Sequence, residues 1–302
     1  MRLKPWIEAM RLRTLPVSVA GVVTGTACAI SRHGFSVLPF LICLFFAILA
    51  QITSNFANEY YDFKNGLDKK GREGFRRGVT EGDISPQAMK KATFITLLIA
   101  VCLGSTLIIW GGWWLIFIGL AVAIFALAYS TGPFPLSHNG LGEVAVVIFF
   151  GFIPVVFTEY VQTRVFYFDT TTALSAAAVG LMAANVLIVN NYRDADDDRI
   201  VGKRTSVVIL GRKVMAAVYY ADGVFAAIFM AMASSQLPFW VSAGWLTYFA
   251  LHTMLWTKLR SLSGSALNDV LKWTSILLLA VSCYFLIIFA SLKPDDQFFI
   301  FP

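Results

Sequence analysis

The sequence predicts an all-α integral membrane protein, a bundle of about nine transmembrane helices forming a single domain over residues 1–302. Of the 302 residues, 58% are hydrophobic and only 14% are charged, whereas soluble domains carry roughly 25% charged residues. The mean hydropathy is +0.70. Apolar runs of about 20 residues, the length that crosses the hydrocarbon core as a helix, recur along the chain.

Nine apolar runs are candidate spans. The third and fourth are separated only by Gly111 and Gly112, which predicts a tight hairpin. Pro154 falls inside the fifth, where neighbouring helices can satisfy the carbonyl group that a proline leaves without its hydrogen bond. The expected spans are 15–31, 38–57, 90–110, 112–130, 143–160, 171–191, 214–233, 237–257 and 271–291.

The lysines and arginines predict the orientation of the bundle. With a cytoplasmic N-terminus, all 24 of them except Arg32, Arg164 and Lys293 fall on the cytoplasmic side. Basic residues concentrate in the cytoplasmic loops of membrane proteins, so we expect this orientation. The same rule accounts for the formal charge of +6 without a nucleic-acid partner.

The cysteines and histidines give no sign of a metal site. All four cysteines lie in apolar runs without C-x-x-C spacing, and the three histidines are scattered. We therefore expect the cysteines to be small buried hydrophobic residues that form no disulfide.

Two acidic stretches each follow a long apolar run. NEYYDFKNGLD spans residues 58–68, NNYRDADDDRIVGKRTS spans residues 190–206, and both begin Asn-x-Tyr-x-Asp. In the predicted topology they lie at the cytoplasmic ends of the second and sixth helices, next to catalytic loops at about 58–90 and 191–213. The repeat indicates an internal duplication with halves of about 1–135 and 136–302, and such proteins often bind their substrate where the halves meet.

In the first acidic stretch, Asn58 and Asp62 are four residues apart and therefore share a helix face. Asp68 is six residues beyond Asp62 and can converge with it only if the helix ends between them. Gly66 is well placed to end the helix.

In the second acidic stretch, the same spacing aligns Asn190, Asp194 and Asp198 on one helix face. Asp196 and Asp197 lie elsewhere on the helical wheel, and we expect them to face water or basic neighbours. Each of the two helix ends is thus predicted to present one asparagine and two carboxylates towards a common point.

Four carboxylates crowded together repel one another unless a counter-charge is present. Oxygen-rich clusters of this kind suit Mg²⁺, which bridges carboxylates to substrate phosphates. Acids in a cytoplasmic loop can also simply be solvated, but their repeated placement at two helix ends favours a site. The expected Mg²⁺ ligands are Asp62, Asp68, Asp194 and Asp198. The nearby basic residues that suit a diphosphate are Arg11, Lys64, Arg72, Arg76, Arg77, Arg193, Lys203 and Arg204.

These motifs resemble those of the UbiA superfamily of intramembrane prenyltransferases, which carries such acidic motifs after its second and sixth helices. The spacing from Asn58 through Asp62 to Asp68 is similar to that of the 1,4-dihydroxy-2-naphthoate branch, in the menaquinone pathway. Further similar stretches are WIEAMRLRTLPVSVAGVVTGTA, EGDISP, AYSTGPFPLSHNGLGEVAVVIFFGFIPV and NNYRDADDDRIVGKRTSVVILG, whereas the chain beyond Gly211 is only generically apolar.

The sequence departs from that branch at two positions. Glu59 and Glu143 stand where the branch usually has aspartate. Both keep the charge on a longer side chain, so we leave them out of the expected metal ligands.

The resemblance implies an enzyme that transfers the prenyl group of a polyprenyl diphosphate to 1,4-dihydroxy-2-naphthoate, with loss of CO₂, to give demethylmenaquinol. It also implies a bacterial inner membrane, with the site on the cytoplasmic side. Asn58 would orient the metal ligands, and Tyr129 would stabilise positive charge at the reacting carbon or serve as an interfacial tyrosine. The residues expected to contact the diphosphate or the acceptor are Arg11, Lys64, Arg76, Asn190, Arg193 and Lys203.

Two alternatives remain open at this point. A related enzyme of the same family would use another aromatic acceptor, such as 4-hydroxybenzoate. A cation transporter with duplicated acidic sites would place those sites near the bilayer midplane, whereas these acids lie at helix ends beside basic residues.

Overall fold

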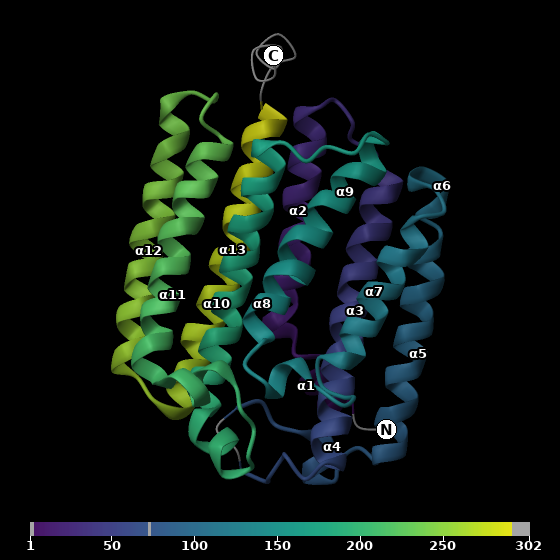
Figure 1. Cartoon of the computed structure of the whole chain (residues 1–302), viewed down its shortest axis with the longest axis vertical. Coiled ribbons are helices and arrows are strands. Elements are labelled where there is room, and N and C mark those ends of the chain that lie inside the picture. Colours follow the sequence, from purple (N-terminus) through teal and green to yellow (C-terminus); the bar gives the residue numbers. More distant parts are fainter. Residues whose placement is uncertain (1–2, 72–73, 292–302) are drawn as a thin grey trace.

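The computed structural model describes residues 3–71 and 74–291, and these residues form helices and connecting turns without a β-strand (Figure 1). A π-helical turn, η3, joins α8 to α9. The helices are α1 (Leu3–Met10), α2 (Leu15–Ser31), α3 (Val37–Lys64), α4 (Gly78–Glu81), α5 (Pro86–Ser105), α6 (Ile108–Gly111), α7 (Leu115–Ala128), α8 (Gly142–Val146), η3 (Val147–Phe152), α9 (Ile153–Thr163), α10 (Thr170–Ile200), α11 (Ser206–Ala233), α12 (Ser242–Ser261) and α13 (Leu267–Ser291).

Within the described ranges, seven helical segments are long and apolar enough to cross a membrane, so the chain is a multi-pass membrane protein. They coincide with seven of the nine expected spans. The fourth and eighth expected spans, 112–130 and 237–257, correspond to α7 and α12, which fall outside that set of seven. With its 14 residues, α7 is shorter than a typical span. The expected number of nine spans is therefore not confirmed.

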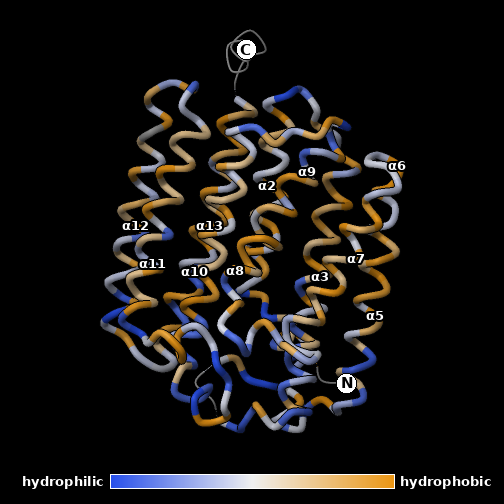
Figure 2. Tube along the Cα trace, viewed as in Figure 1, coloured by the Kyte–Doolittle hydropathy of each residue, from blue (hydrophilic) through white to orange (hydrophobic). Residues whose placement is uncertain are grey.

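The bundle is arranged around α2 and α10. Helix α2 packs against α13 and α9, and α10 packs against α11, α13 and η3. Helix α3 packs against α5 and α7. Hydrophilic residues gather at the end of the bundle where α1 and α4 lie, and apolar residues dominate the rest (Figure 2).

Glycines allow some of these helices to approach very closely. A Cβ atom on Gly25 of α2 would lie 2.4 Å from the backbone oxygen of Val155 in α9, and one on Gly151 of η3 would lie 2.5 Å from that of Ala176 in α10. Helices in membranes associate through such small-residue contacts because lipid supplies little hydrophobic driving force. These contacts fix α9 and η3 between α2 and α10.

Both acidic stretches lie on helix ends, at the same end of the bundle (Figure 1). The segment 191–213, expected to be a loop, is helical as far as Ile200 and again from Ser206. The turn between them contains Gly202, with a φ of 78°, and Thr205, whose side chain caps α11 by accepting a hydrogen bond from the Val208 N–H. Gly211 then kinks α11 with a φ of 82°.

At the opposite end of the bundle, a buried ion-pair cluster ties α2, α9 and α10 together. The Arg32 guanidinium bonds both Glu159, at 2.7 Å, and Asp169, and it lies 3.9 Å from the Tyr167 ring centroid. The Thr172 hydroxyl donates to the other Glu159 oxygen at 2.8 Å. Burial raises the pKa of Asp169, but hydrogen bonds from the Thr172 backbone N–H and from Arg32 outweigh this and hold that pKa below its usual value.

Candidate active site

A polar chamber of about 120 Å³ lies between the ends of α3 and α10. Both acidic stretches contribute to its wall, together with the loop that precedes α4. Its charged and amide-bearing lining includes Asn58, Arg77, Asn190, Asp194, Asp198 and Lys203. Asn58 of the first stretch thus faces the same space as Asn190, Asp194 and Asp198 of the second, whereas Asp62 and Asp68 are not part of its lining.

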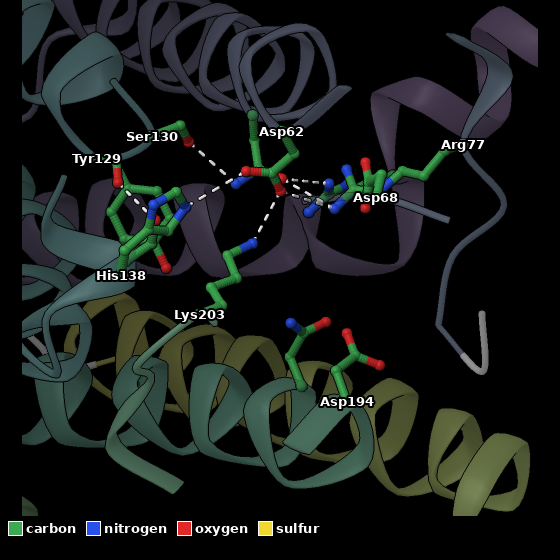
Figure 3. Close-up of polar contacts among 12 residues, drawn as sticks. Asp62, Asp68, Arg77, Tyr129, Ser130, His138, Asp194 and Lys203 are labelled. Carbon is green, nitrogen blue, oxygen red and sulfur yellow. Dashed lines mark hydrogen bonds and ion pairs between the residues drawn. The ribbon is translucent and has the colours of Figure 1, made fainter. Parts of the chain in front are cut away.

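Asp62 is fully buried at the end of α3, and three basic groups converge on it (Figure 3). The Lys203 ammonium donates a hydrogen bond to Asp62 Oδ2 at 2.8 Å, and the Arg77 Nη2 atom lies 3.6 Å from the same oxygen. His138 Nε2 lies 3.4 Å from Asp62 Oδ1. Since Lys203 belongs to the second acidic stretch, its bond to Asp62 joins the two stretches directly.

The α3 helix ends where expected, and this brings Asp68 back towards Asp62. Gly66 has a φ of 69°, and the Leu67 N–H donates to the backbone oxygen of Asp62 at 2.8 Å. Asp68 Oδ2 consequently lies 3.4 Å from Arg77 Nε, so one guanidinium contacts both carboxylates of the first motif.

Asn58 holds two guanidiniums at the chamber wall. Its side-chain oxygen accepts hydrogen bonds from Arg11 Nη2 and Arg77 Nη2, each at 2.9 Å, while its side-chain nitrogen donates to the Ser130 hydroxyl at 3.0 Å. Arg11 is brought there by a left-handed backbone conformation, with a φ of 54°. Asn58 therefore positions basic groups, a role more specific than the predicted one of orienting metal ligands.

In the second motif, Arg193 is directed at protein groups. Its guanidinium bonds both oxygens of Asp194, at 2.7 and 2.8 Å, and also donates to Asn190 Oδ1 at 2.9 Å and Asn268 Oδ1 at 2.8 Å. This geometry fixes Asp194 at the chamber and leaves Arg193 as its positioning residue. Asp198, one turn further on, is buried and lines the chamber.

The two remaining aspartates of that stretch point away from the chamber, as predicted. Asp196 is exposed and pairs with Arg212 at 3.0 Å. Asp197 pairs with Lys69 at 3.1 Å. The expectation that they face water or basic neighbours is confirmed.

The loop after α3 crosses over the second motif. The Phe75 ring lies between two guanidiniums, with the Arg11 Cζ atom 5.8 Å and the Arg193 Cζ atom 5.2 Å from its centroid. A Cβ atom on Gly74 would come within 2.6 Å of the Arg193 guanidinium, so a larger residue there would displace that side chain. The loop is anchored by Glu59, which is buried and accepts a hydrogen bond from the Val79 N–H at 3.0 Å.

A second, apolar chamber of about 300 Å³ adjoins the polar one. It lies among α2, α3, α5, α7 and α9, and its lining is mostly aliphatic and phenylalanine side chains. The residues lining both chambers are Gln51, Ser54, Phe125 and Phe150. We call this boundary, defined by those four residues, the junction.

The other predicted site residues are distributed unevenly. Tyr129 is half-buried, lines the polar chamber and packs edge-to-face on Phe125, with ring centroids 5.8 Å apart. Lys64 is exposed and Arg76 pairs with Asp83 and Glu8, and neither lines the chamber. Arg72 lies outside the described residues.

Sequence reasoning missed three residues that contact Asn58 or Asp62. His138 was considered only as a potential metal ligand, Ser130 was not singled out within AYSTGP, and Arg77 was not distinguished from its basic neighbours. A signal existed for the first two, since both belong to the stretch AYSTGPFPLSHNG that marked the resemblance.

The donor chemistry of the chamber fits Mg²⁺, although the side chains are paired with bases. Asp194 and Asp198 line it, and the buried Asp62 Oδ1 accepts no hydrogen bond from the described residues. Hard carboxylate oxygens are the ligands that Mg²⁺ prefers. Within the same described ranges, no three His, Cys, Asp or Glu side chains are grouped as a ready metal site.

The sequence matches the model of the UbiA prenyltransferase family over residues 18–276. Similar curated proteins include the 1,4-dihydroxy-2-naphthoate octaprenyltransferases of Escherichia coli, 39% identical over 73% of this chain and 72% of that protein, and of Mycobacterium leprae, 34% identical over 82% and 84%. That of Haemophilus influenzae is 35% identical over 70% of each chain.

Solved structures share the fold at low sequence identity. A UbiA homolog from Archaeoglobus fulgidus bound to GPP and Mg²⁺ matches with a TM-score of 0.66 at 14% identity, over 95% of this chain and 99% of that one. The apo structure of a UbiA homolog from Aeropyrum pernix matches with a TM-score of 0.64 at 16% identity, over 97% and 100%.

Proposed function

This chain belongs to the UbiA prenyltransferase family and is a prenyltransferase, and we propose that it transfers a polyprenyl group from its diphosphate to 1,4-dihydroxy-2-naphthoate. The observation that supports this most directly is the pair of adjoining chambers. One is lined by carboxylates and basic groups that suit a diphosphate, and the other is apolar and suits a polyprenyl tail. The acceptor is proposed from the names of the relatives.

Basic side chains would hold the diphosphate in the polar chamber. Arg11, Arg77 and Lys203 all line it, and each is held in place by Asn58 or Asp62. Guanidiniums and ammoniums both bind phosphate oxygens strongly, the former through two parallel hydrogen bonds. The exposed Lys64 and the paired Arg76 are less suitable than Arg77, which reaches into the chamber.

Mg²⁺ would be held by carboxylates chosen from Asp62, Asp68, Asp194 and Asp198, and when bound it would stabilise negative charge on the leaving diphosphate. Arg193 would keep Asp194 directed at the chamber. Arg77 and Lys203 beside Asp62 would offset the repulsion among these carboxylates.

The reaction itself would take place at the junction. The allylic C–O bond breaks and its electron pair leaves with the diphosphate, while the ring carbon that bears the carboxylate forms the new C–C bond. Loss of the carboxyl group as CO₂ then restores the aromatic ring. Tyr129 and Phe125 present aromatic faces near this point, where they would stabilise the developing positive charge.

We further propose that the polar chamber faces the cytoplasm, in a bacterial inner membrane. The hydrophilic end of the bundle (Figure 2) is the end where the described lysines and arginines concentrate, and basic residues gather on the cytoplasmic side. Cysteine labelling at position 65 after α3 and at position 235 after α11 should report opposite sides of the membrane.

The test of the function uses purified protein with Mg²⁺, a polyprenyl diphosphate and a choice of acceptors. We expect 1,4-dihydroxy-2-naphthoate to be prenylated, with a product mass that shows loss of the carboxyl group and release of diphosphate. Prenylation of 4-hydroxybenzoate with its carboxylate retained, and no product from the naphthoate, would replace this proposal by the alternative acceptor.

A further inference from the structure

The junction contains a side-chain amide that the protein itself does not satisfy. Gln51 lines both chambers, and its Oε1 atom is buried without a hydrogen-bond partner among the described residues. Buried amide oxygens are nearly always hydrogen-bonded, and leaving one unmatched is costly. An unmatched oxygen at the wall of a substrate chamber is therefore a candidate ligand contact.

Two polar neighbours of Gln51 on the same helix, Thr53 and Asn55, bond to protein atoms. Asn55 donates to the backbone oxygen of Met10 at 3.0 Å. The Thr53 hydroxyl lies within hydrogen-bond distance of the Leu49 backbone oxygen and of the Thr96 hydroxyl, at 2.8 and 2.9 Å. Gln51 differs from both in lining the two chambers, with a buried amide oxygen that no described residue bonds.

The position of Gln51 along α3 places it beyond the diphosphate site. It precedes Asp62 by about three helical turns, a rise of roughly 16 Å at 1.5 Å per residue, and it precedes Asn58 by about two. Ser54, one turn nearer to Asn58, lines the same junction. The α3 face therefore changes from carboxylate to amide to apolar side chains as it passes from one chamber to the other.

The reacting carbon must lie at this junction if the diphosphate occupies the polar chamber and the tail occupies the apolar one. An aromatic acceptor must then bring its ring to the same point. A ring hydroxyl is a strong hydrogen-bond donor, and the Gln51 oxygen is an acceptor. Donating that hydrogen bond also leaves more electron density on the hydroxyl oxygen, which makes the ring a better nucleophile.

We propose that the Gln51 amide, with the Ser54 hydroxyl beside it, binds a ring hydroxyl of the aromatic acceptor and so fixes the ring at the junction. This inference rests on the proposed function, because it assigns an acceptor contact within the same site. It assigns to Gln51 a part in acceptor selectivity: acceptors with a hydroxyl at the matching position are preferred over analogues without one.

The test compares the natural enzyme with Gln51→Leu, a change that keeps most of the side-chain volume but removes both polar atoms. For 1,4-dihydroxy-2-naphthoate we expect kcat/KM to fall roughly tenfold to a hundredfold, as for loss of one hydrogen bond to a buried group. The KM for the polyprenyl diphosphate should stay within about twofold. Thr53→Val, on the same helix but bonded to Thr96, is the matched control and should leave both constants within about twofold.

A set of three acceptors separates recognition of the hydroxyl from general damage to the site. The natural enzyme and Gln51→Leu are each assayed with 1,4-dihydroxy-2-naphthoate and with analogues lacking one or other hydroxyl. For each acceptor, kcat/KM of the natural enzyme is divided by kcat/KM of Gln51→Leu. The intrinsic reactivity of the ring cancels in this ratio. We expect this ratio of kcat/KM values to be large for the dihydroxy acceptor. For the analogue that lacks the bound hydroxyl it should be about one.

Three results would overturn the inference. One is a Gln51→Leu enzyme as active on the dihydroxy acceptor as the natural enzyme. Another is a ratio that is the same for all acceptors, which would indicate damage to the site as a whole. The third is a loss confined to the KM for polyprenyl diphosphate. If the natural enzyme itself fails to prenylate the naphthoate, the proposed function fails, and that result is distinguishable from these three.

Discussion

Replacing Asn58 by alanine should disable the enzyme without unfolding it. The Asn58 side chain accepts hydrogen bonds from Arg11 and Arg77 and donates one to Ser130. Alanine removes all three bonds and leaves two guanidiniums at the chamber wall without the acceptor that orients them. Because Asn58 lies beside the chamber, the substitution opens space next to an existing cavity and removes little apolar packing.

The size of the effect follows from the number and kind of bonds lost. A hydrogen bond to a charged group contributes about 1.5–3 kcal/mol. Arg77 keeps its contacts with Asp62 and Asp68, so we count the equivalent of one strong bond, about 3 kcal/mol at the upper end. At about 1.4 kcal/mol per factor of ten, this corresponds to roughly a hundredfold loss of kcat/KM.

The assay measures kcat/KM for the polyprenyl diphosphate at saturating acceptor and Mg²⁺. Ser130→Ala is the graded comparison, because it removes only the neutral bond, worth about 1 kcal/mol, and should cost roughly fivefold. Asn58→Ala activity within threefold of the natural enzyme, or a loss no larger than that of Ser130→Ala, would refute the role of Asn58 in holding the two guanidiniums.

Four further outcomes are expected. Asp198→Asn should reduce turnover more than a hundredfold at saturating Mg²⁺ while the melting temperature in detergent changes little, and full activity would contradict a metal role for this residue. Ala47→Phe, which fills part of the apolar chamber, should reduce turnover of a long polyprenyl diphosphate far more than that of geranyl diphosphate; equal losses would argue against a tail site there. Arg32→Met leaves the buried Glu159 without its partner and should destabilise the protein by about 3–5 kcal/mol, read as a lower melting temperature. Because the pKa of Asp169 is depressed in the fold, its stabilising contribution is present above its unfolded pKa of about 3.9 and is lost as pH falls below that value. The acid-side fall in melting temperature should therefore be smaller in Asp169→Asn, and an unchanged fall would contradict this linkage.

Regular periodicity is what made the helix ends of the site predictable. The 3.6-residue repeat places Asn58 with Asp62 and Asn190 with Asp194, and the left-handed Gly66 ends α3 so that Asp68 folds back. These relations are local, and local geometry is what a sequence encodes most directly.

The choice between neighbouring residues in a loop could not be predicted in the same way. Arg76 and Arg77 are adjacent, yet the side chain of Arg76 is 46% exposed and pairs with Asp83, whereas that of Arg77 is 6% exposed and contacts both carboxylates of the first motif. An irregular loop has no period from which side-chain direction can be inferred.

Contacts between helices that are distant in the sequence also could not be predicted. We expected Arg193 to contact the diphosphate. In the fold, its Nη1 atom instead donates a hydrogen bond to Asn268, at the start of α13. The two cavities and their junction similarly depend on which faces of α3, α5, α7 and α9 meet, and helix amphipathicity is weak information in a chain that is apolar on most faces.

The bond between Lys203 and Asp62 also bears on how the chain is made. The two residues are 141 positions apart, and at about 5–20 residues per second a ribosome needs roughly ten to thirty seconds to cover that distance. During that interval Asp62, which is buried in the complete fold, has been synthesised at the end of α3 but lacks Lys203 as a partner. Arg77, in the adjoining loop, is close enough in the chain to neutralise it while the later helices are still being synthesised. A nascent chain arrested before α10 should therefore already pair Asp62 with Arg77, and Lys203 adds a second basic partner once the chain beyond α10 has been made.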